Sequence, residues 1–188
     1  MSVKGNHPQA ANDGALNRDL WLALDEAALT ALCIRQTFRG SGPGGQHRNT
    51  TSSGVRMVHQ PTGLCGQATQ GRSQVDNIRA ALMSLRWTIA IEIRLPLNLD
   101  SPILLQHRTG DRLTHITRPI APQLAAIVLD ALADTGFVVN AAASNLGVSS
   151  SQLAGFITDH PPLLTAANRG RESHQLRALT APGRNGSR

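Results

Sequence analysis

The chain has 188 residues and a formal net charge of +6, from 18 lysine and arginine residues against 12 acidic ones. This length fits one domain or one domain with a small extension, and a hydrophobic content of 40% excludes a fibrous or wholly disordered chain. No apolar run reaches the ~18 residues that span a bilayer. The first residues (MSVKGNHPQAANDG) contain no signal-peptide core, so we expect a cytoplasmic protein rather than a membrane or secreted one.

The cysteines and histidines do not form a metal-binding pattern. Cys33 and Cys65 are too few for a disulfide framework or a four-ligand zinc site. We expect both to be buried small hydrophobic residues in a reducing compartment, with a single disulfide as the alternative. The seven histidines are scattered without metal-ligand spacing. We therefore predict no metal.

The basic charge is arginine, since Lys4 is the one lysine of the chain. No acidic residue lies between Glu26 and Asp76, whereas that window holds five arginines: Arg35, Arg39, Arg48, Arg56 and Arg72. Such a window predicts a positive field that would hold a polyanion; the alternative is chance clustering in an acid-poor chain. Aromatic residues make up only 3% and tyrosine is absent, so we do not expect a base-stacking platform.

The first half of the chain predicts a small mixed domain after a polar N-terminus. We expect a short helix at residues 19–32, a strand at 33–39, and a loop at 40–46 that contains four glycines and a proline. Residues 55–59 and 64–69 flank a turn and predict a β-hairpin. A long helix should then begin after Ser73 as N-cap and stop before Pro96.

Two stripes run along that long helix. Its predicted apolar stripe consists of Val75, Ile78, Leu82, Leu85, Ile89 and Ile93. The arginines Arg72, Arg79 and Arg86 recur every seven residues and therefore lie along one side. Two interpretations stay open for these arginines: an ordinary solvated helix face, or a ridge that faces RNA.

The second half predicts a connector at 97–118, a helix at 120–133 ended by Gly136, and two short helices at 140–146 and 150–159 around Gly147. This pair resembles a helix-turn-helix. Residues 119–168 contain three aspartates and no lysine or arginine, so the phosphate contacts that a DNA reader needs are missing. We expect a structural or partner-docking module and do not expect DNA as a partner.

The predicted fold class is therefore α+β, with a small mixed sheet, a long packing helix and a projecting Gly-Gly-Gln loop, followed by a small helical module. We divide the chain into five segments: a flexible N-terminus (1–18), the mixed domain (19–96), the connector (97–118), the helical module (119–168) and an arginine-containing tail (169–188).

The loop residues Gly44, Gly45 and Gln46 are the candidates for chemistry. Two glycines let the backbone approach a crowded partner and adopt conformations closed to other residues. Gln46 offers a neutral donor and acceptor but cannot act as a base, so it could only position groups and stabilise negative charge on an activated substrate such as an ester. Taken alone, the loop is better explained as a plain surface loop or a phosphate cradle.

A longer stretch narrows this choice. Residues 39–74 (RGSGPGGQHRNTTSSGVRMVHQPTGLCGQATQGRSQ) resemble the catalytic domain of class I peptide-chain release factors. The shared elements are SGPGGQH, Asn49-Thr50-Thr51, Val55-Arg56, the turn at 59–63, and Arg72-Ser73-Gln74 followed by Asn77. They occur in the family's order and spacing within residues 33–95.

The resemblance implies a ribosome-dependent peptidyl-tRNA hydrolase that works in the peptidyl-transferase centre of a bacterial ribosome. Gly44, Gly45 and Gln46 would be catalytic, with the Gln46 N–H stabilising the leaving 3′-oxygen. Gln46 would also be a target for N-methylation by a glutamine methyltransferase, and no metal or organic cofactor is implied. The expected partners are ribosomal RNA and peptidyl-tRNA, and the expected RNA contacts are Arg39, Ser41, His47, Arg48, Asn49, Arg56, Arg72, Gln74 and Arg79.

The sequence also departs from the family pattern. Arg48 lies where a small apolar residue is common, and Gly54 lies where alanine is usual. The 32 residues before Cys33 are too few for codon-reading domains, which favours the short relatives that rescue stalled ribosomes independently of the codon. Their basic tail is weaker here, with five arginines and Glu172 in 169–188. The alternatives are a catalytically silent ribosome- or RNA-binding factor and a helix-turn-helix regulator.

Overall fold

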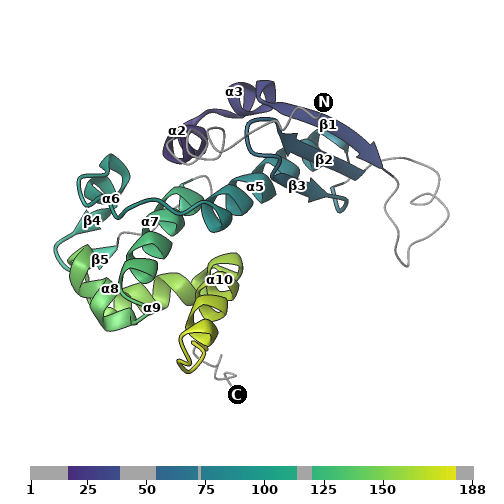
Figure 1. The fold of residues 1–188 in the computed structure, drawn as a ribbon. Coiled ribbons are helices and arrows are strands. Elements are labelled where there is room, and N and C mark those ends of the chain that lie inside the picture. The colour runs from purple at the N-terminus through teal and green to yellow at the C-terminus, as the bar shows by residue number, and fades with distance from the viewer. Residues whose placement is uncertain (1–16, 39–53, 72, 114–119, 181–188) are drawn as a thin grey trace, which may run out of the picture. The chain divides into compact units, whose positions relative to one another are not determined.

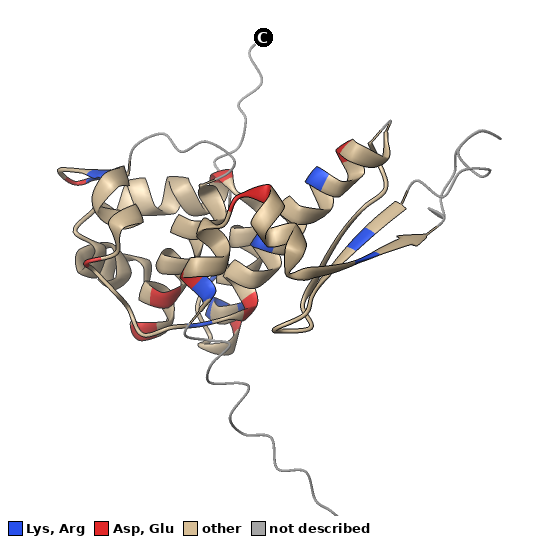
Figure 2. Cartoon of the chain, turned by 90° about the horizontal axis from the view of Figure 1, so that it is seen from above, with Lys and Arg blue, Asp and Glu red and all other residues tan. Residues whose placement is uncertain are grey.

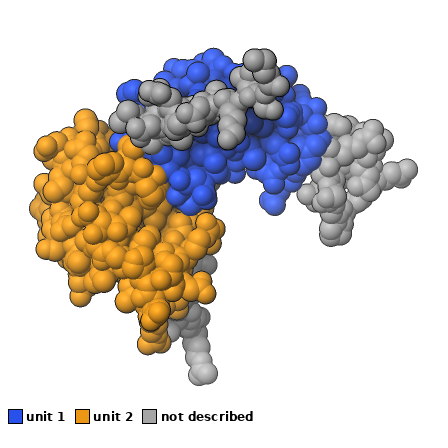
Figure 3. All heavy atoms as spheres, viewed as in Figure 1, with its two compact units in different colours: residues 1–93 blue, residues 94–188 orange. Residues whose placement is uncertain are grey.

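We analysed a computed structural model that describes residues 17–38, 54–71, 73–113 and 120–180. The chain divides into two compact units, residues 1–93 (unit 1) and residues 94–188 (unit 2) (Figure 3). Helices and small sheets occur together, so the predicted α+β class is confirmed at this level. The predicted segment limits at residues 18, 96, 118 and 168 stay predictions.

Unit 1 is built on a three-stranded antiparallel sheet (Figure 1). Its strands are β1 (Cys33–Phe38), β2 (Gly54–His59) and β3 (Cys65–Ala68), with β2 in the middle. The β2–β3 hairpin was predicted from its turn, which the backbone closes because Gly63 N donates to His59 O at 2.8 Å. Gly63 has φ +71°, a conformation that glycine adopts without strain.

One face of this sheet is covered by the long helix α5 (Gln74–Glu92), which packs against β2 and β3. Ser73 caps it as predicted, since its Oγ accepts from Asp76 N at 3.1 Å. A Cβ on Gly66 of β3 would overlap the backbone of Ala81 and Leu85, so helix and strand touch directly at this glycine. The residues of α5 that are buried are Asn77, Ala81, Leu82, Leu85, Arg86, Ile89 and Ala90.

The predicted apolar stripe of α5 is therefore wrong at its start. Val75 is 57% exposed and takes no part in the core. The helix also ends at Glu92, earlier than Pro96 requires. Its last turn is closed by Arg18, whose Nη1 donates to Ile93 O at 3.1 Å while the side chain is 1% exposed.

The predicted helix at 19–32 is two helices, α2 (Arg18–Ala23) and α3 (Glu26–Ala31). Leu24 is extended between them, and the Asp25 carboxylate starts α3 by accepting from Ala28 N at 2.7 Å. The backbone carbonyls at the C-terminal end of α2 accept hydrogen bonds from Arg86 of α5, which donates to Leu22 O at 2.6 Å and to Leu24 O at 2.5 Å. The break thus depends on a residue far away in the sequence.

Unit 2 is mainly helical (Figure 1). The central helix α7 (Ala121–Asp134) is buried along most of its length and contacts α6 (Pro102–His107), α8 (Val139–Leu146) and α10 (Pro161–Ser173). Asp130 of α7 is 3% exposed and accepts from Arg94 Nη1 and from Leu95 N, both at 3.1 Å. This carboxylate fixes the start of the unit to its central helix.

The helices α8 and α9 (Ser150–Asp159) lie close to the predicted ranges. Gly147 ends α8 in the left-handed region at φ 66°, and Ser149 caps α9 by accepting from Gln152 N at 3.4 Å. The stretch predicted as a connector contains α6 and a two-stranded sheet of β4 (Arg108–Thr109) and β5 (Arg112–Leu113), elements that the sequence did not predict. Helix α10 was not predicted at all.

Candidate functional site

The predicted catalytic segment joins the two outer positions of one strand ladder. In the β1–β2 pair, Phe38 lies opposite Gly54, and the chain between them is residues 39–53. Both ends of this segment are therefore fixed side by side on the sheet. The predicted residues Gly44, Gly45 and Gln46, and the predicted RNA contacts Arg39, Ser41, His47, Arg48 and Asn49, lie outside the described residues.

The sheet that carries this segment has two unlike faces. Val55, Met57 and Gly66 point toward α5 and are buried. The alternate residues form the open face in three rows set by strand register. From the loop end inward these rows are Phe38 with Gly54, then Gln36 with Arg56 and Gln67, then Ile34 with Val58 and Cys65.

Arg56 is the predicted RNA contact that the structure describes best. It lies on the central strand and is exposed, and its Nη2 donates to Gln67 Oε1 at 3.3 Å. On the other side its guanidinium carbon is 5.8 Å from the centre of the Phe38 ring, within cation–π range. No carboxylate is paired with Arg56 among the described residues. Its charge is held in place and not neutralised there.

Gly54 explains one departure from the family pattern. A Cβ at this position would lie 2.7 Å from Phe38 O and 3.0 Å from Phe38 Cε2. Such distances are too short for an ordinary contact, and the nearer atom belongs to the backbone, which cannot swing away. The glycine therefore lets the Phe38 ring lie across β2, where it meets Arg56.

The N-terminus of α5 is held by a side-chain clamp. Asn77 is fully buried, and its Oδ1 accepts from Gly71 N at 2.7 Å while its Nδ2 donates to Gly71 O at 3.4 Å. Because Ser73 caps the same turn, the chain from Gly71 into α5 is fixed at two points. The sequence analysis included Asn77 in the family motif but did not predict that its side chain binds the Gly71 backbone.

Three further predicted RNA contacts lie in or near the first turns of α5. Gln74 is exposed in the first turn of α5, and Arg72 lies outside the described residues. Arg79 is 64% exposed and its Nε lies 3.7 Å from the Glu26 carboxylate, so it is a surface side chain with a loose ion pair. An exposed pair of this kind contributes little to stability.

Arg86 corrects the interpretation of an RNA-facing ridge. It is only 7% exposed, and its guanidinium closes α2 rather than facing solvent. Burial lowers the pKa of Arg86, while Glu26 and Asp25 raise it. A seven-residue spacing places residues on one side of a helix but does not tell whether that side meets water or another helix.

Several further arginines donate hydrogen bonds to backbone carbonyls within the fold. Arg108 Nη1 donates to Leu146 O at 2.9 Å and closes α8, and Arg171 Nη1 donates to Phe137 O at 2.7 Å. Arg18, Arg86 and Arg94 likewise bind backbone carbonyls or a buried carboxylate. These five arginines lie outside the acid-free window between Glu26 and Asp76, so they leave the charge of that window unchanged.

The structure describes both cysteines and their surroundings. Cys33 and Cys65 are both free; Cys33 is half-buried and Cys65 is exposed, so the expectation that both are buried is wrong. Burial raises the pKa of the Cys33 thiol. The described residues contain no group of three or more histidine, cysteine, aspartate or glutamate side chains that could hold a metal ion.

His59 ends β2 as a fully buried side chain. Its Nδ1 is hydrogen-bonded to Thr62 Oγ1 at 2.8 Å, and its ring meets Trp21 edge-on at 4.6 Å between centroids. Burial lowers the pKa of His59, so the ring is held neutral. The imidazole therefore joins the hairpin turn to α2 and does not serve as a surface base.

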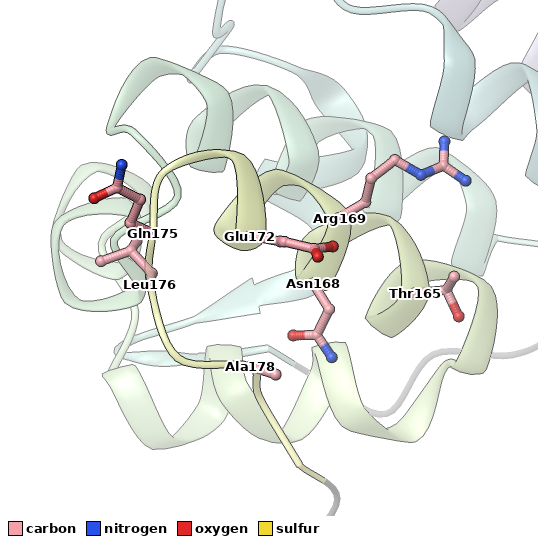
Figure 4. A pocket seen from close by; sticks show the side chains of 7 residues that line it. All are labelled: Thr165, Asn168, Arg169, Glu172, Gln175, Leu176 and Ala178. Carbon is pink, nitrogen blue, oxygen red and sulfur yellow. The ribbon is translucent and has the colours of Figure 1, made fainter.

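In unit 2, helix α9 presents no basic residue, as its sequence SSQLAGFITD requires. Residues 174–180 return along α10, because Asn168 exchanges two hydrogen bonds with the Leu179 backbone, at 2.7 and 3.0 Å. Between helix and return segment lies an open groove of about 770 Å³ (Figure 4). Its lining residues are Thr165, Asn168, Arg169, Glu172, Gln175, Leu176 and Ala178.

The charged side chains among the described residues that line this groove are Arg169 and Glu172. Arg171, predicted to lie in a basic tail, instead binds the backbone of Phe137 and of Arg177. Among the described residues, no single helix is long and apolar enough to cross a membrane; α7 and α8 pass that test only as a pair bent by 120°.

Comparison with known proteins adds to this geometry. Residues 29–98 match the family described as the RF-1 domain. Over 152 residues the chain is 33% identical to peptide chain release factor 1 of Myxococcus xanthus, covering 79% of this chain and 38% of the relative. It is 39% identical over 92 residues to peptide chain release factor 1 of Ureaplasma parvum, covering 46% of this chain and 25% of the relative.

A shorter stretch of 50 residues is 58% identical to the mitochondrial peptide chain release factor 1 of Bos taurus, covering 27% of this chain and 11% of the relative. The chain thus spans well under half the length of these curated relatives. No solved structure matches it.

Proposed function

We propose that this chain promotes hydrolysis of the peptidyl-tRNA ester on the ribosome, because residues 29–98 match the RF-1 domain. The observation that carries the proposal is the sequence SGPGGQH at residues 41–47, which lies inside the matched domain. The segment that contains it starts and ends at paired positions of one strand ladder, Phe38 and Gly54. A rigid sheet is a suitable base for a loop that must reach a distant reaction centre.

The proposed chemistry needs positioning rather than a strong base. The ester of peptidyl-tRNA is already activated, and Gln46 cannot remove a proton at neutral pH. The backbone N–H of Gln46 would donate to the leaving 3′-oxygen as negative charge develops there. Gly44 and Gly45 would allow the backbone conformation that aims this N–H, and the Gln46 side chain would help to position water.

RNA binding is the second part of the proposal. Arg56, Gln74 and Arg79 are exposed on unit 1 and are proposed to contact ribosomal RNA or tRNA, together with Arg39, Ser41, His47, Arg48, Asn49 and Arg72. Arg56 has the best support, because its guanidinium is held by Gln67 and Phe38 without a carboxylate partner among the described residues. N-methylation of Gln46 by a glutamine methyltransferase completes the proposal.

The form of the activity that we propose is codon-independent release from stalled ribosomes. A catalytically silent factor that binds the ribosome and keeps the loop is the second candidate. The two differ in one readout, because only the first cleaves the ester.

The test is release of a labelled peptide from purified ribosomes, with wild type and Gly45→Ala run side by side. One set of ribosomes is stalled on an mRNA without a stop codon, and a second set carries a stop codon in the decoding site. Release by wild type from both sets, and loss of release in Gly45→Ala, is the expected result. Release only at the stop codon would contradict the codon-independent form. Binding without release on either set would favour the silent factor.

A further inference from the structure

From the strand register we infer that the row Gln36–Arg56–Gln67, on the open face of the unit 1 sheet, is a binding site for the ribose-phosphate backbone of ribosomal RNA. This inference rests on the proposed function for its partner, and adds a surface and two glutamines that the predicted contacts did not include. We call these three residues the polar row.

The polar row crosses the whole sheet. Gln36 of β1 lies opposite Arg56 of β2, and Arg56 lies opposite Gln67 of β3. All three side chains are exposed. Since neighbouring strands are about 4.8 Å apart, the row spans roughly 10 Å. It lies one row inward from Phe38 and Gly54, where the catalytic segment leaves the sheet.

The polar row presents mainly donors. Arg56 carries five N–H donors and no acceptor, and one donor is used on Gln67 Oε1 at 3.3 Å. Because that bond occupies the oxygen of Gln67, its NH₂ group is the part left to meet a partner. A surface of this kind fits a partner rich in acceptors, as the phosphate and ribose oxygens of RNA are.

Charge favours the same partner. The three strands contain Arg35 and Arg56 and no acidic residue, and Figure 2 shows basic segments and no acidic segment on them. The Phe38 ring, 5.8 Å from the guanidinium carbon, supports Arg56 from the loop side. Gly54 leaves room for that ring, because a Cβ there would lie 3.0 Å from Phe38 Cε2. The arginine is thus preorganised, so less conformational entropy is lost when it binds a phosphate.

The experiment measures binding of the full chain to purified large ribosomal subunits at several salt concentrations between about 50 and about 200 mM. Three variants are compared with wild type: Arg56→Gln, the double variant Gln36→Ala/Gln67→Ala, and Arg35→Gln. The last is the matched control, because it removes one positive charge from the same sheet but alternates to the other face. Thermal unfolding of each variant checks the fold, which these exposed side chains should leave unchanged.

Arg56→Gln should weaken binding about tenfold and lower the slope of log K against log salt by about 0.7–0.9. The double glutamine variant should weaken binding about fivefold with an unchanged slope, because neutral donors release no counterions. Arg35→Gln should have a clearly smaller effect than Arg56→Gln.

Unchanged binding in Arg56→Gln, or an equal loss in Arg35→Gln, would overturn the inference. A loss in Arg56→Gln without a change of slope would also overturn it, since this would indicate a protein surface as the partner. The outcome is separate from that of the release assay. Wild type could bind through the polar row and release nothing, or release peptide without using the row.

Discussion

Replacing Arg86 by methionine tests whether this arginine holds the fold or faces RNA. The substitution keeps a long side chain but leaves the carbonyls of Leu22 and Leu24 without their donor, at present 2.6 and 2.5 Å away. An unsatisfied buried carbonyl costs about 1–3 kcal/mol, and removing a buried charge returns part of that cost. We therefore expect Arg86→Met to lower the free energy of unfolding of unit 1 by about 3 kcal/mol.

Urea unfolding followed by tryptophan fluorescence is the assay, because both tryptophans of the chain, Trp21 and Trp87, lie in unit 1. Arg79→Met is the control, since it removes the same group from the same helix at a site that is 64% exposed. The control should change stability by less than about 0.5 kcal/mol. Equal stabilities of Arg86→Met and Arg79→Met would refute the assignment of Arg86 as a helix-closing residue.

Three further substitutions test separate contacts. Gly66→Ala should destabilise unit 1, since a Cβ there would overlap the backbone of α5; the same urea assay measures the loss, and unchanged stability would contradict the close contact of α5 with β3. Gly54→Ala should displace Phe38 and, through it, weaken the binding of ribosomal subunits by the row that contains Arg56, which the salt titration measures. His59 has a pKa lowered by burial, so its contribution to stability is complete above about pH 6.5 and is lost as the pH falls through its lowered folded pKa. Wild type should thus lose stability relative to His59→Gln on going from neutral to mildly acidic pH, and parallel stability curves for the two proteins would contradict this.

Local signals in the sequence were sufficient for the parts of the fold that local interactions determine. Ser73 begins α5 because its hydroxyl accepts a backbone N–H three residues later. Gly147 ends α8 because a left-handed φ of 66° suits glycine. The β2–β3 hairpin follows from its short turn, which fixes the register of the two strands.

Features that depend on distant residues could not be predicted. The carbonyls at the break between α2 and α3 accept from Arg86, which lies more than 60 residues further along the chain. Arg79 and Arg86 are seven residues apart on the same helix, but their surroundings differ. Arg79 is 64% exposed, whereas Arg86 is 7% exposed. Burial of a long basic side chain depends on which element packs against it, and this is a property of tertiary structure.

The candidate site also contains residues that the sequence could predict and residues that it could not. Gly44, Gly45 and Gln46 could be singled out from residue types alone, because their order and surroundings are distinctive. The polar row could not, because its register depends on the pairing of β1 with β2 across the long connection at 39–53, and only short loops fix register by themselves. The place of Gly54 under Phe38 likewise appears only once that pairing is known.

The measurement that tests the central claim most directly is simultaneous recording of ribosome binding and peptide release for wild type and Gly45→Ala. We predict that both proteins bind ribosomes with similar affinity and that only wild type releases the labelled peptide. This result would separate the chemistry of the Gly-Gly-Gln loop from the binding surface of the sheet. Equal release by the two proteins would contradict the assignment of Gly44, Gly45 and Gln46 as catalytic. Binding by wild type with no release would contradict the proposal that this chain is a ribosome-dependent peptidyl-tRNA hydrolase.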